Sequence, residues 1–192
     1  GDTVFAAAHR LHAALAGRVL ARSDFRVPAL ATVDLSGARV EGVRAAGKHL
    51  FIELTGDGDR RVFIHSHLKV EGVWHLYRPG ERWRRPAHTA RIVLDASPPE
   101  SASPSASHPP AEPVPTREGP SRSPVHAVGF SLGILELLDD PAPVIASLGP
   151  DPLADTWDGE LAAENQRARP DRPIGLALLD QRVLAGVGNV YR

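Results

Sequence analysis

The sequence predicts an α+β fold, in which an N-terminal helix and an antiparallel two-sheet β-sandwich precede a small helical domain. Three features predict it: an apolar helical stripe at the start, short β-like runs up to about residue 138, and a helical pattern from Pro141 onward. The 192 residues are 42% hydrophobic and 23% charged, a balance typical of a folded chain with one domain or two small ones. We place the boundary near residue 140, between domains 1–140 and 141–192.

The first predicted element is an amphipathic helix over residues 3–15. It follows a possible cap at Asp2 or Thr3 and stops at Gly17. Its apolar face carries Val4, Ala8, Leu11 and Leu15. The spacing of these four residues is the helical period, so we expect them to face the core.

Six β-like runs follow, each rich in β-branched residues and bounded by glycine or aspartate. They cover residues 18–22, 38–45, 49–54, 61–66, 72–77 and 89–95, and a strand-like pattern resumes over 127–138. Their alternation of apolar and polar residues favours antiparallel pairing in two packed sheets.

A proline-rich segment interrupts this β-like series. Residues 97–125 contain nine of the chain's 18 prolines, seven serines and no aromatic side chain. Such a composition buries too little apolar surface to offset the entropy of ordering. We therefore predict a disordered insertion within the β domain.

The last third of the sequence is helical in pattern. Short helices are predicted over residues 141–148, 158–169 and 173–181, two of them opened by proline. The glycine-rich turn at 186–188 then leads to an expected helix start at Asn189. Because only three residues follow, the chain is expected to be cut from a longer protein.

Composition excludes some classes of protein. The chain has no cysteine, which excludes disulfides and thiolate metal sites. It has no apolar run of about 20 residues and no signal-peptide pattern, so we expect a cytoplasmic protein without membrane partners.

The net charge of -1 does not indicate a polyanionic partner, but residues 78–91 carry five arginines around Trp83. Two interpretations stay open for this stretch: a solvated loop between strands, or a contact with backbone phosphates.

Three motifs resemble the formamidopyrimidine-DNA glycosylase and endonuclease VIII family of base-excision repair, in its endonuclease VIII-like branch. They are "GDTVFAAAHRL" at the start, "AGKHLFIEL" at 46–54 and "LLDQRVLAGVGNVYR" at 178–192, supported by "HSHLKVEGVW" at 65–74. The resemblance implies that the β-sandwich forms one wall of a DNA cleft and that a helix-two-turn-helix domain, residues 141–192, forms the other. It implies a bifunctional DNA glycosylase and abasic-site lyase acting on oxidised bases in duplex DNA, with pyrimidines favoured.

Two other functions remain as alternatives. One is a noncatalytic damaged-DNA binding module of the same fold, and the other is a domain with no nucleic-acid role. For both the glycosylase and the noncatalytic DNA-binding module, we expect a monomer associated with the bacterial nucleoid.

The resemblance also implies roles for individual residues. Lys48 would contact the phosphate beside the damaged nucleotide and assist proton transfers, a dual role that a flexible ammonium suits. Gly188 and Asn189 would bind a phosphate. Taken alone, Lys48 would be a solvated charge in a hairpin and Asn189 a plain helix cap.

Residues 67–70 resemble the segment that fills the duplex once a base has left the stack. Leu68 and Val70 would form the apolar wedge, with Val70 standing where many relatives carry methionine. His67 and Lys69 would contact DNA. The alternatives are core positions in a strand for Leu68 and Val70, and a solvent-facing lysine for Lys69.

Two departures from the family pattern lie at the ends of the sequence. The family's nucleophilic proline and its glutamate acid/base would precede Gly1, and its four-cysteine zinc ribbon would follow Arg192. Neither is among these residues, so the chain as written is expected to be inactive and to bind no metal, with zinc belonging to the missing ribbon.

Overall fold

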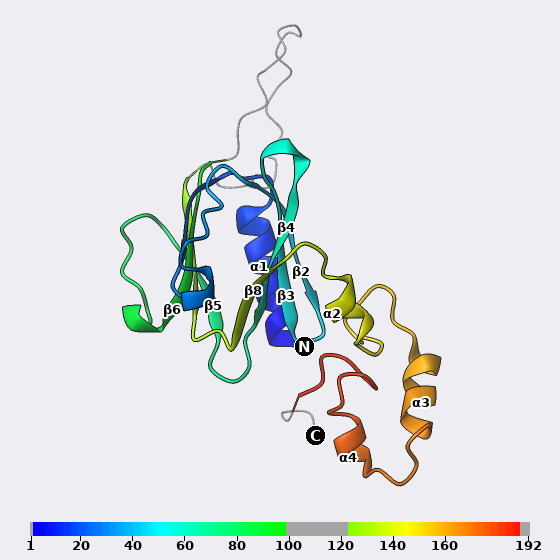
Figure 1. Cartoon of the computed structure of the whole chain (residues 1–192). Coiled ribbons are helices and arrows are strands. Elements are labelled where there is room, and N and C mark those ends of the chain that lie inside the picture. Colours follow the sequence, from blue (N-terminus) through cyan, green and yellow to red (C-terminus); the bar gives the residue numbers. More distant parts are fainter. Residues whose placement is uncertain (1, 99–122, 189–192) are drawn as a thin grey trace, which may run out of the picture.

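A computed structural model describes residues 2–98 and 123–188, and it shows a helix enclosed by strands with a helical segment beside them (Figure 1). The strands are β1 (Leu20–Phe25), β2 (Arg39–Ala46), β3 (His49–Thr55), β4 (Arg61–His67), β5 (Val73–Tyr77), β6 (Ala90–Ala96), β7 (Val125–Phe130) and β8 (Ile134–Leu138). The helices are α1 (Asp2–Leu15), α2 (Ala142–Ala146), α3 (Gly159–Arg167) and α4 (Ile174–Ala177), with 3-10 turns η1 (Pro28–Leu30), η2 (Asp57–Asp59) and η3 (Ala87–Thr89). The predicted order of a leading helix, a series of strands and then short helices is confirmed, while the helix start predicted at Asn189 lies outside the described residues.

The strands form two four-stranded antiparallel sheets, in the orders β2-β3-β4-β8 and β1-β6-β7-β5. The pattern predicted as one strand-like run over 127–138 is divided between them. β7 ends at Phe130, Ser131 adopts a positive φ of 48°, and β8 begins at Ile134 in the other sheet. Because Ser131 is not a glycine, the sequence gives little sign of this left-handed turn.

Helix α1 packs against strands of both sheets and supplies one side of the core. Its four predicted core residues are all buried. The helix begins at Asp2, and Gly17 follows it with a φ of 77°, a left-handed conformation that glycine adopts without strain. The predicted amphipathic helix is therefore confirmed.

Four chain segments meet at one end of the sandwich, and we call this end the rim. It comprises the β2–β3 turn (47–48), the β4–β5 turn (68–72), η3 and the β7–β8 turn (131–133). The strand register requires this arrangement, because His67 pairs with both His49 and Ile134, while Phe130 pairs with both Val73 and Ala90. Candidate residues from distant parts of the sequence are thus brought to a common edge.

Strands β6 and β7 pair beside the predicted insertion. Ala96 lies opposite Val125, so the insertion leaves and re-enters the same sheet between neighbouring strands. Buried Arg18 holds both ends by donating from Nη1 to the carbonyl oxygens of Ser97 (3.2 Å) and Ser123 (2.8 Å). Residues 99–122, most of the segment predicted to be disordered, lie outside the described residues. Within the described ranges no helix is long and apolar enough to cross a bilayer.

Candidate active site and nucleic-acid interface

Lys48 lies in the β2–β3 turn, which is docked against the C-terminal segment. The Gly47 backbone N–H donates to Asp151 Oδ2 at 2.7 Å. A side chain at Gly47 would place its Cβ 3.3 Å from Ala185 Cβ, and Gly47 has a φ of 58°, so both the space and the backbone favour glycine. The turn that carries Lys48 is thereby fixed against residues more than a hundred positions away.

The Lys48 ammonium lies beside the predicted phosphate-binding turn. A Cβ built on Gly188 would lie 3.7 Å from Lys48 Nζ, close enough for contact. Partial burial lowers the pKa of Lys48, because it disfavours the charged amine. The structure therefore brings Lys48 and Gly188 together, while Asn189 lies outside the described residues.

The glycine-rich turn is braced by Gln181, a residue that the sequence reasoning missed. Gln181 Oε1 accepts from the Gly186 N–H at 2.9 Å, and its Nε2 donates to the carbonyl oxygens of Leu179 and Val187, each at 3.0 Å. Gly186 has a φ of 84°. The side-chain amide of Gln181 thus fixes the conformation of the turn. The position of Gln181 inside the motif at 178–192 was the sequence signal that could have pointed to it.

The β4–β5 turn separates the two predicted wedge residues. Leu68 is 5% exposed and belongs to the core, whereas Val70 is 97% exposed at the rim. The turn is closed by a 2.9 Å hydrogen bond from the Gly72 N–H to the Leu68 carbonyl oxygen. The core alternative thus agrees with the burial of Leu68, and Val70 is the apolar side chain available to enter a duplex.

His67 and Lys69, the predicted DNA contacts, are sequence neighbours of the predicted wedge residues. The Lys69 N–H donates to His67 Nδ1 at 2.9 Å, so Nδ1 is unprotonated and a neutral His67 carries its proton on Nε2, ready to donate. Burial, with the nearby charges of Lys48, Lys69 and His65, lowers the pKa of His67. The aliphatic part of Lys69 packs over Gly133, where a Cβ would overlap it. Lys69 itself is exposed.

A row of polar side chains that the sequence reasoning missed crosses the first sheet behind His67. Glu136 Oε1 lies 2.8 Å from His65 Nδ1, and His65 Nε2 lies 2.8 Å from His49 Nδ1. Since a carboxylate only accepts, His65 donates to Glu136. Burial, His65 and His67 lower the pKa of His49 to about 4, against the opposing effect of Glu136. His49 also packs edge-on against His67, with ring centroids 5.0 Å apart.

These residues offer no metal centre. No group of three or more histidine or carboxylate side chains in the described part of the chain is arranged to hold a metal ion. The sequence contains no cysteine, so the donor set of a four-cysteine zinc ribbon is not supplied by these 192 residues. The chemistry of the rim is accordingly that of an ammonium, imidazoles and backbone amides.

Comparison with known proteins identifies the family of this chain. The pattern of the formamidopyrimidine-DNA glycosylase N-terminal domain matches residues 2–104. The chain belongs to the formamidopyrimidine-DNA glycosylase and endonuclease VIII family. The predicted family membership is confirmed.

Within this family the similarity is to endonuclease 8. The chain is 47% identical over 193 residues to "Endonuclease 8 2" of Mycobacterium tuberculosis, covering 100% of this chain and 64% of that protein. It is also 47% identical to "DNA-(apurinic or apyrimidinic site) lyase Nei2" of Mycolicibacterium smegmatis, covering 63% of that protein. The chain thus spans just under two thirds of the length of these relatives.

Solved structures show the same fold. The formamidopyrimidine-DNA glycosylase of Lactococcus lactis, bound to DNA containing an abasic site, matches with a TM-score of 0.65 at 20% identity, covering 98% of this chain and 64% of that one. The predicted combination of a leading helix with an antiparallel two-sheet sandwich is confirmed.

Proposed function

We propose that this protein is a bifunctional DNA glycosylase and abasic-site lyase of base-excision repair, acting on oxidised bases in duplex DNA with oxidised pyrimidines favoured. The observation that carries the proposal is the meeting of Lys48 with the glycine-rich turn, at the same end of the sandwich as exposed Val70. The names of the endonuclease 8 and abasic-site lyase relatives support the same activity.

Lys48 is the proposed catalytic residue of this chain. An ammonium of lowered pKa binds a phosphate in its charged form and accepts a proton readily when neutral. The amides of the turn at Gly188, with Asn189, would hold the phosphate beside the damaged nucleotide.

The family's nucleophilic proline and its glutamate would stand directly ahead of Gly1. Asp2, in the first turn of α1, lines a cavity of about 260 Å³ together with Gly186 and Val187. The start of α1 therefore lies close to the glycine-rich turn, and we place the family's amine on this side of the site. Such an amine attacks the sugar carbon as the base leaves, which gives a covalent intermediate.

Val70 is the proposed wedge, flanked by His67 and Lys69 as DNA contacts. Extruding a base costs a few kcal/mol of stacking and pairing, and an apolar side chain in the gap offsets part of this cost. Leu68 would support the wedge from the core rather than enter the duplex.

The domain division at residue 140 and the helix-two-turn-helix assignment for 141–192, which includes α3 and α4, are part of this proposal. In the complete protein the zinc ribbon would add further DNA contacts, and the protein would act as a monomer. The alternative is a damaged-DNA binding module without catalysis.

Borohydride trapping on an abasic-site duplex tests the proposal, in a polypeptide that carries Pro-Glu ahead of Gly1 and the family's C-terminal continuation. We expect a covalent adduct and strand cleavage. Lys48→Ala should abolish most cleavage with little loss of stability, because a charge in a turn contributes little to folding. The chain's other lysine provides the control, since Lys69→Ala should weaken binding but leave saturated cleavage intact. Duplex binding without any adduct would favour the noncatalytic module.

A further inference from the structure

The loop between β5 and β6 concentrates positive charge in a chain whose net charge is -1. We call residues 78–89 the arginine loop. Its exposed arginines are Arg78, Arg82, Arg84 and Arg85. Arg84 pairs with Glu81 at 3.7 Å, whereas no carboxylate in the described part of the chain pairs with the guanidinium groups of Arg78, Arg82 or Arg85. Three guanidinium groups are therefore available to an anionic partner, and of these Arg82 and Arg85 lie closest in sequence to Trp83.

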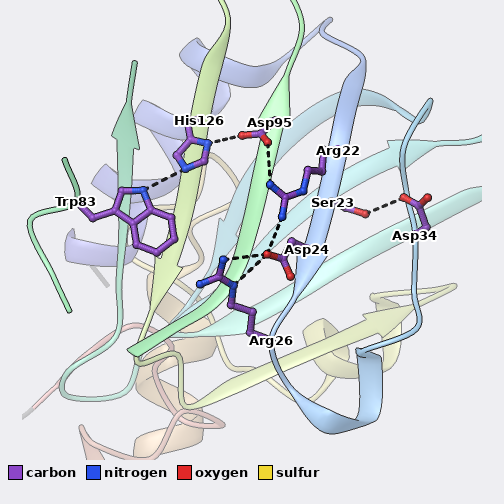
Figure 2. Close-up of polar contacts among 8 residues, drawn as sticks. All are labelled: Arg22, Ser23, Asp24, Arg26, Asp34, Trp83, Asp95 and His126. Atoms are coloured by element: carbon purple, nitrogen blue, oxygen red, sulfur yellow. Dashed lines mark hydrogen bonds and ion pairs between the residues drawn. The ribbon is translucent and has the colours of Figure 1, made fainter. Parts of the chain in front are cut away.

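The arginine loop is held rigidly on the outer face of the second sheet. Figure 2 shows the Trp83 indole donating to His126 Nε2 at 3.1 Å, and His126 in turn bonded to Asp95. The Arg26 guanidinium lies over the Trp83 ring, 5.2 Å from its centroid. The Arg84 N–H donates to the Tyr77 hydroxyl at 3.0 Å. Because the backbone is already ordered, binding here would cost little conformational entropy.

The end of the arginine loop belongs to the rim. The Ser131 N–H donates to the Thr89 carbonyl oxygen at 2.8 Å, and the Gly133 N–H donates to the His67 carbonyl oxygen at 2.9 Å. These bonds join η3 through the β7–β8 turn to the segment that precedes the wedge. Along the rim, Lys48 therefore lies in the first sheet, Val70 lies in a turn that crosses between sheets, and η3, the end of the arginine loop, lies beside the second sheet. The preceding part of the loop runs along the outer face of the second sheet from Tyr77, which pairs with His126.

We propose that the arginine loop binds phosphates of the DNA strand opposite the lesion. The inference rests on the proposed function, in which Lys48 contacts the damaged strand and Val70 enters the duplex between the two strands. A group on the far side of the wedge from Lys48 then faces the undamaged strand. Guanidinium groups suit this role, because they bind phosphate oxygens with two parallel hydrogen bonds.

The salt dependence of duplex binding tests the contact. We expect Arg82→Gln/Arg85→Gln to reduce the slope of log affinity against log salt by about 2, one for each lost phosphate contact. The matched control is Arg60→Gln/Arg61→Gln, which removes the same charge at η2 and the start of β4, the end of the sandwich opposite the rim. Equal slopes for the two double variants would overturn the inference.

Neutral methylphosphonate linkages identify the strand. Placed in the undamaged strand, they should weaken binding by the parent protein and have little effect on the Arg82→Gln/Arg85→Gln variant. Placed in the damaged strand, they should weaken both proteins equally. The reverse pattern would overturn the assignment to the opposite strand.

Borohydride trapping at saturating protein separates this inference from the proposed function. If the Arg82→Gln/Arg85→Gln variant binds like the control and is trapped normally, phosphate binding by the arginine loop is refuted and the enzyme assignment stays intact. In the polypeptide that carries Pro-Glu and the C-terminal continuation, absence of trapping, with binding still dependent on the loop and on the undamaged strand, would refute the enzyme assignment alone.

Discussion

His49 is a residue whose environment makes stability depend on pH. Its pKa of about 4 lies below the ordinary 6.5, because burial and the neighbouring His65 and His67 disfavour the charged ring. Between pH 4 and 6.5 the unfolded chain therefore binds more protons at this histidine than the folded chain does. The contribution of His49 to the free energy of unfolding is complete above pH 6.5 and is lost as the pH falls toward 4. We expect His49→Gln to remove about 1 to 2 kcal/mol of this acid-dependent loss, allowing for screening at a partly exposed ring.

Urea unfolding of the parent and His49→Gln at pH 4.5 and 7.5 measures the effect. From pH 7.5 to pH 4.5, the urea midpoint of the parent should fall more than the urea midpoint of His49→Gln. His88→Gln, at an exposed histidine in η3, is the control and should behave like the parent. An identical acid shift in His49→Gln and the parent would contradict the assignment.

The β4–β5 turn contains two residues that should respond in opposite ways. Val70→Ser removes an exposed apolar side chain, so stability should change by less than about 0.5 kcal/mol, while excision should slow roughly tenfold as the wedge loses apolar area. Gly72→Ala should destabilise the fold, because its Cβ would overlap the Leu68 carbonyl oxygen. Thermal unfolding and single-turnover excision separate the two. If Val70→Ser were destabilised but excised the base at the normal rate, Val70 would be a structural residue and not the wedge.

At the scale of elements, the sequence predicted the helix and most strands because their periodicity is local. It did not predict the division between β7 and β8, since Ser131 adopts a left-handed conformation without the usual glycine. Nor did it predict the row formed by His49, His65 and Glu136. That row depends on the register of three strands far apart in the sequence, which no local pattern encodes.

The β6–β7 connection gives a prediction for an element. Replacing residues 99–122 with a short glycine linker should shift the thermal midpoint by no more than a few degrees, because Ala96 and Val125 already pair and Arg18 still holds Ser97 and Ser123. Arg18→Ala should be far more damaging, since it removes a buried guanidinium together with its hydrogen bonds to both carbonyl oxygens. If the deletion proved as harmful as Arg18→Ala, the excised segment would contribute to the folded β domain.

At the scale of the whole molecule, the helical segment and the sandwich meet through a small set of contacts. A cleft of about 1150 Å³ lies between α1 and β2 on one side and residues 145–165 on the other. The two parts join where Gly47 bonds to Asp151 and packs against Ala185. Within the helical segment, the Pro150 carbonyl oxygen accepts from the Ala185 N–H at 2.9 Å, which holds these two contact points together. The family motifs predicted that Lys48 and the glycine-rich turn each contact a phosphate, whereas the hydrogen bond from Gly47 to Asp151 could not be predicted from the sequence.

Asp151 should therefore control the active geometry without supporting the core of the sandwich. Asp151→Ala removes the acceptor for the Gly47 N–H, a loss of about 1 to 2 kcal/mol of docking. Lys48 would then lose its fixed position beside Gly188, and a displacement of about 1 Å at a reacting group costs on the order of a hundredfold in rate. We expect faster amide exchange at Gly47, unchanged protection in β3, and slower trapping of an abasic-site duplex. Asp151→Asn keeps one acceptor oxygen where Asp151 uses both, for the N–H groups of Gly47 and Leu153, so it should restore only part of the rate. Equal trapping by Asp151→Ala and the parent would show that this contact does not position Lys48.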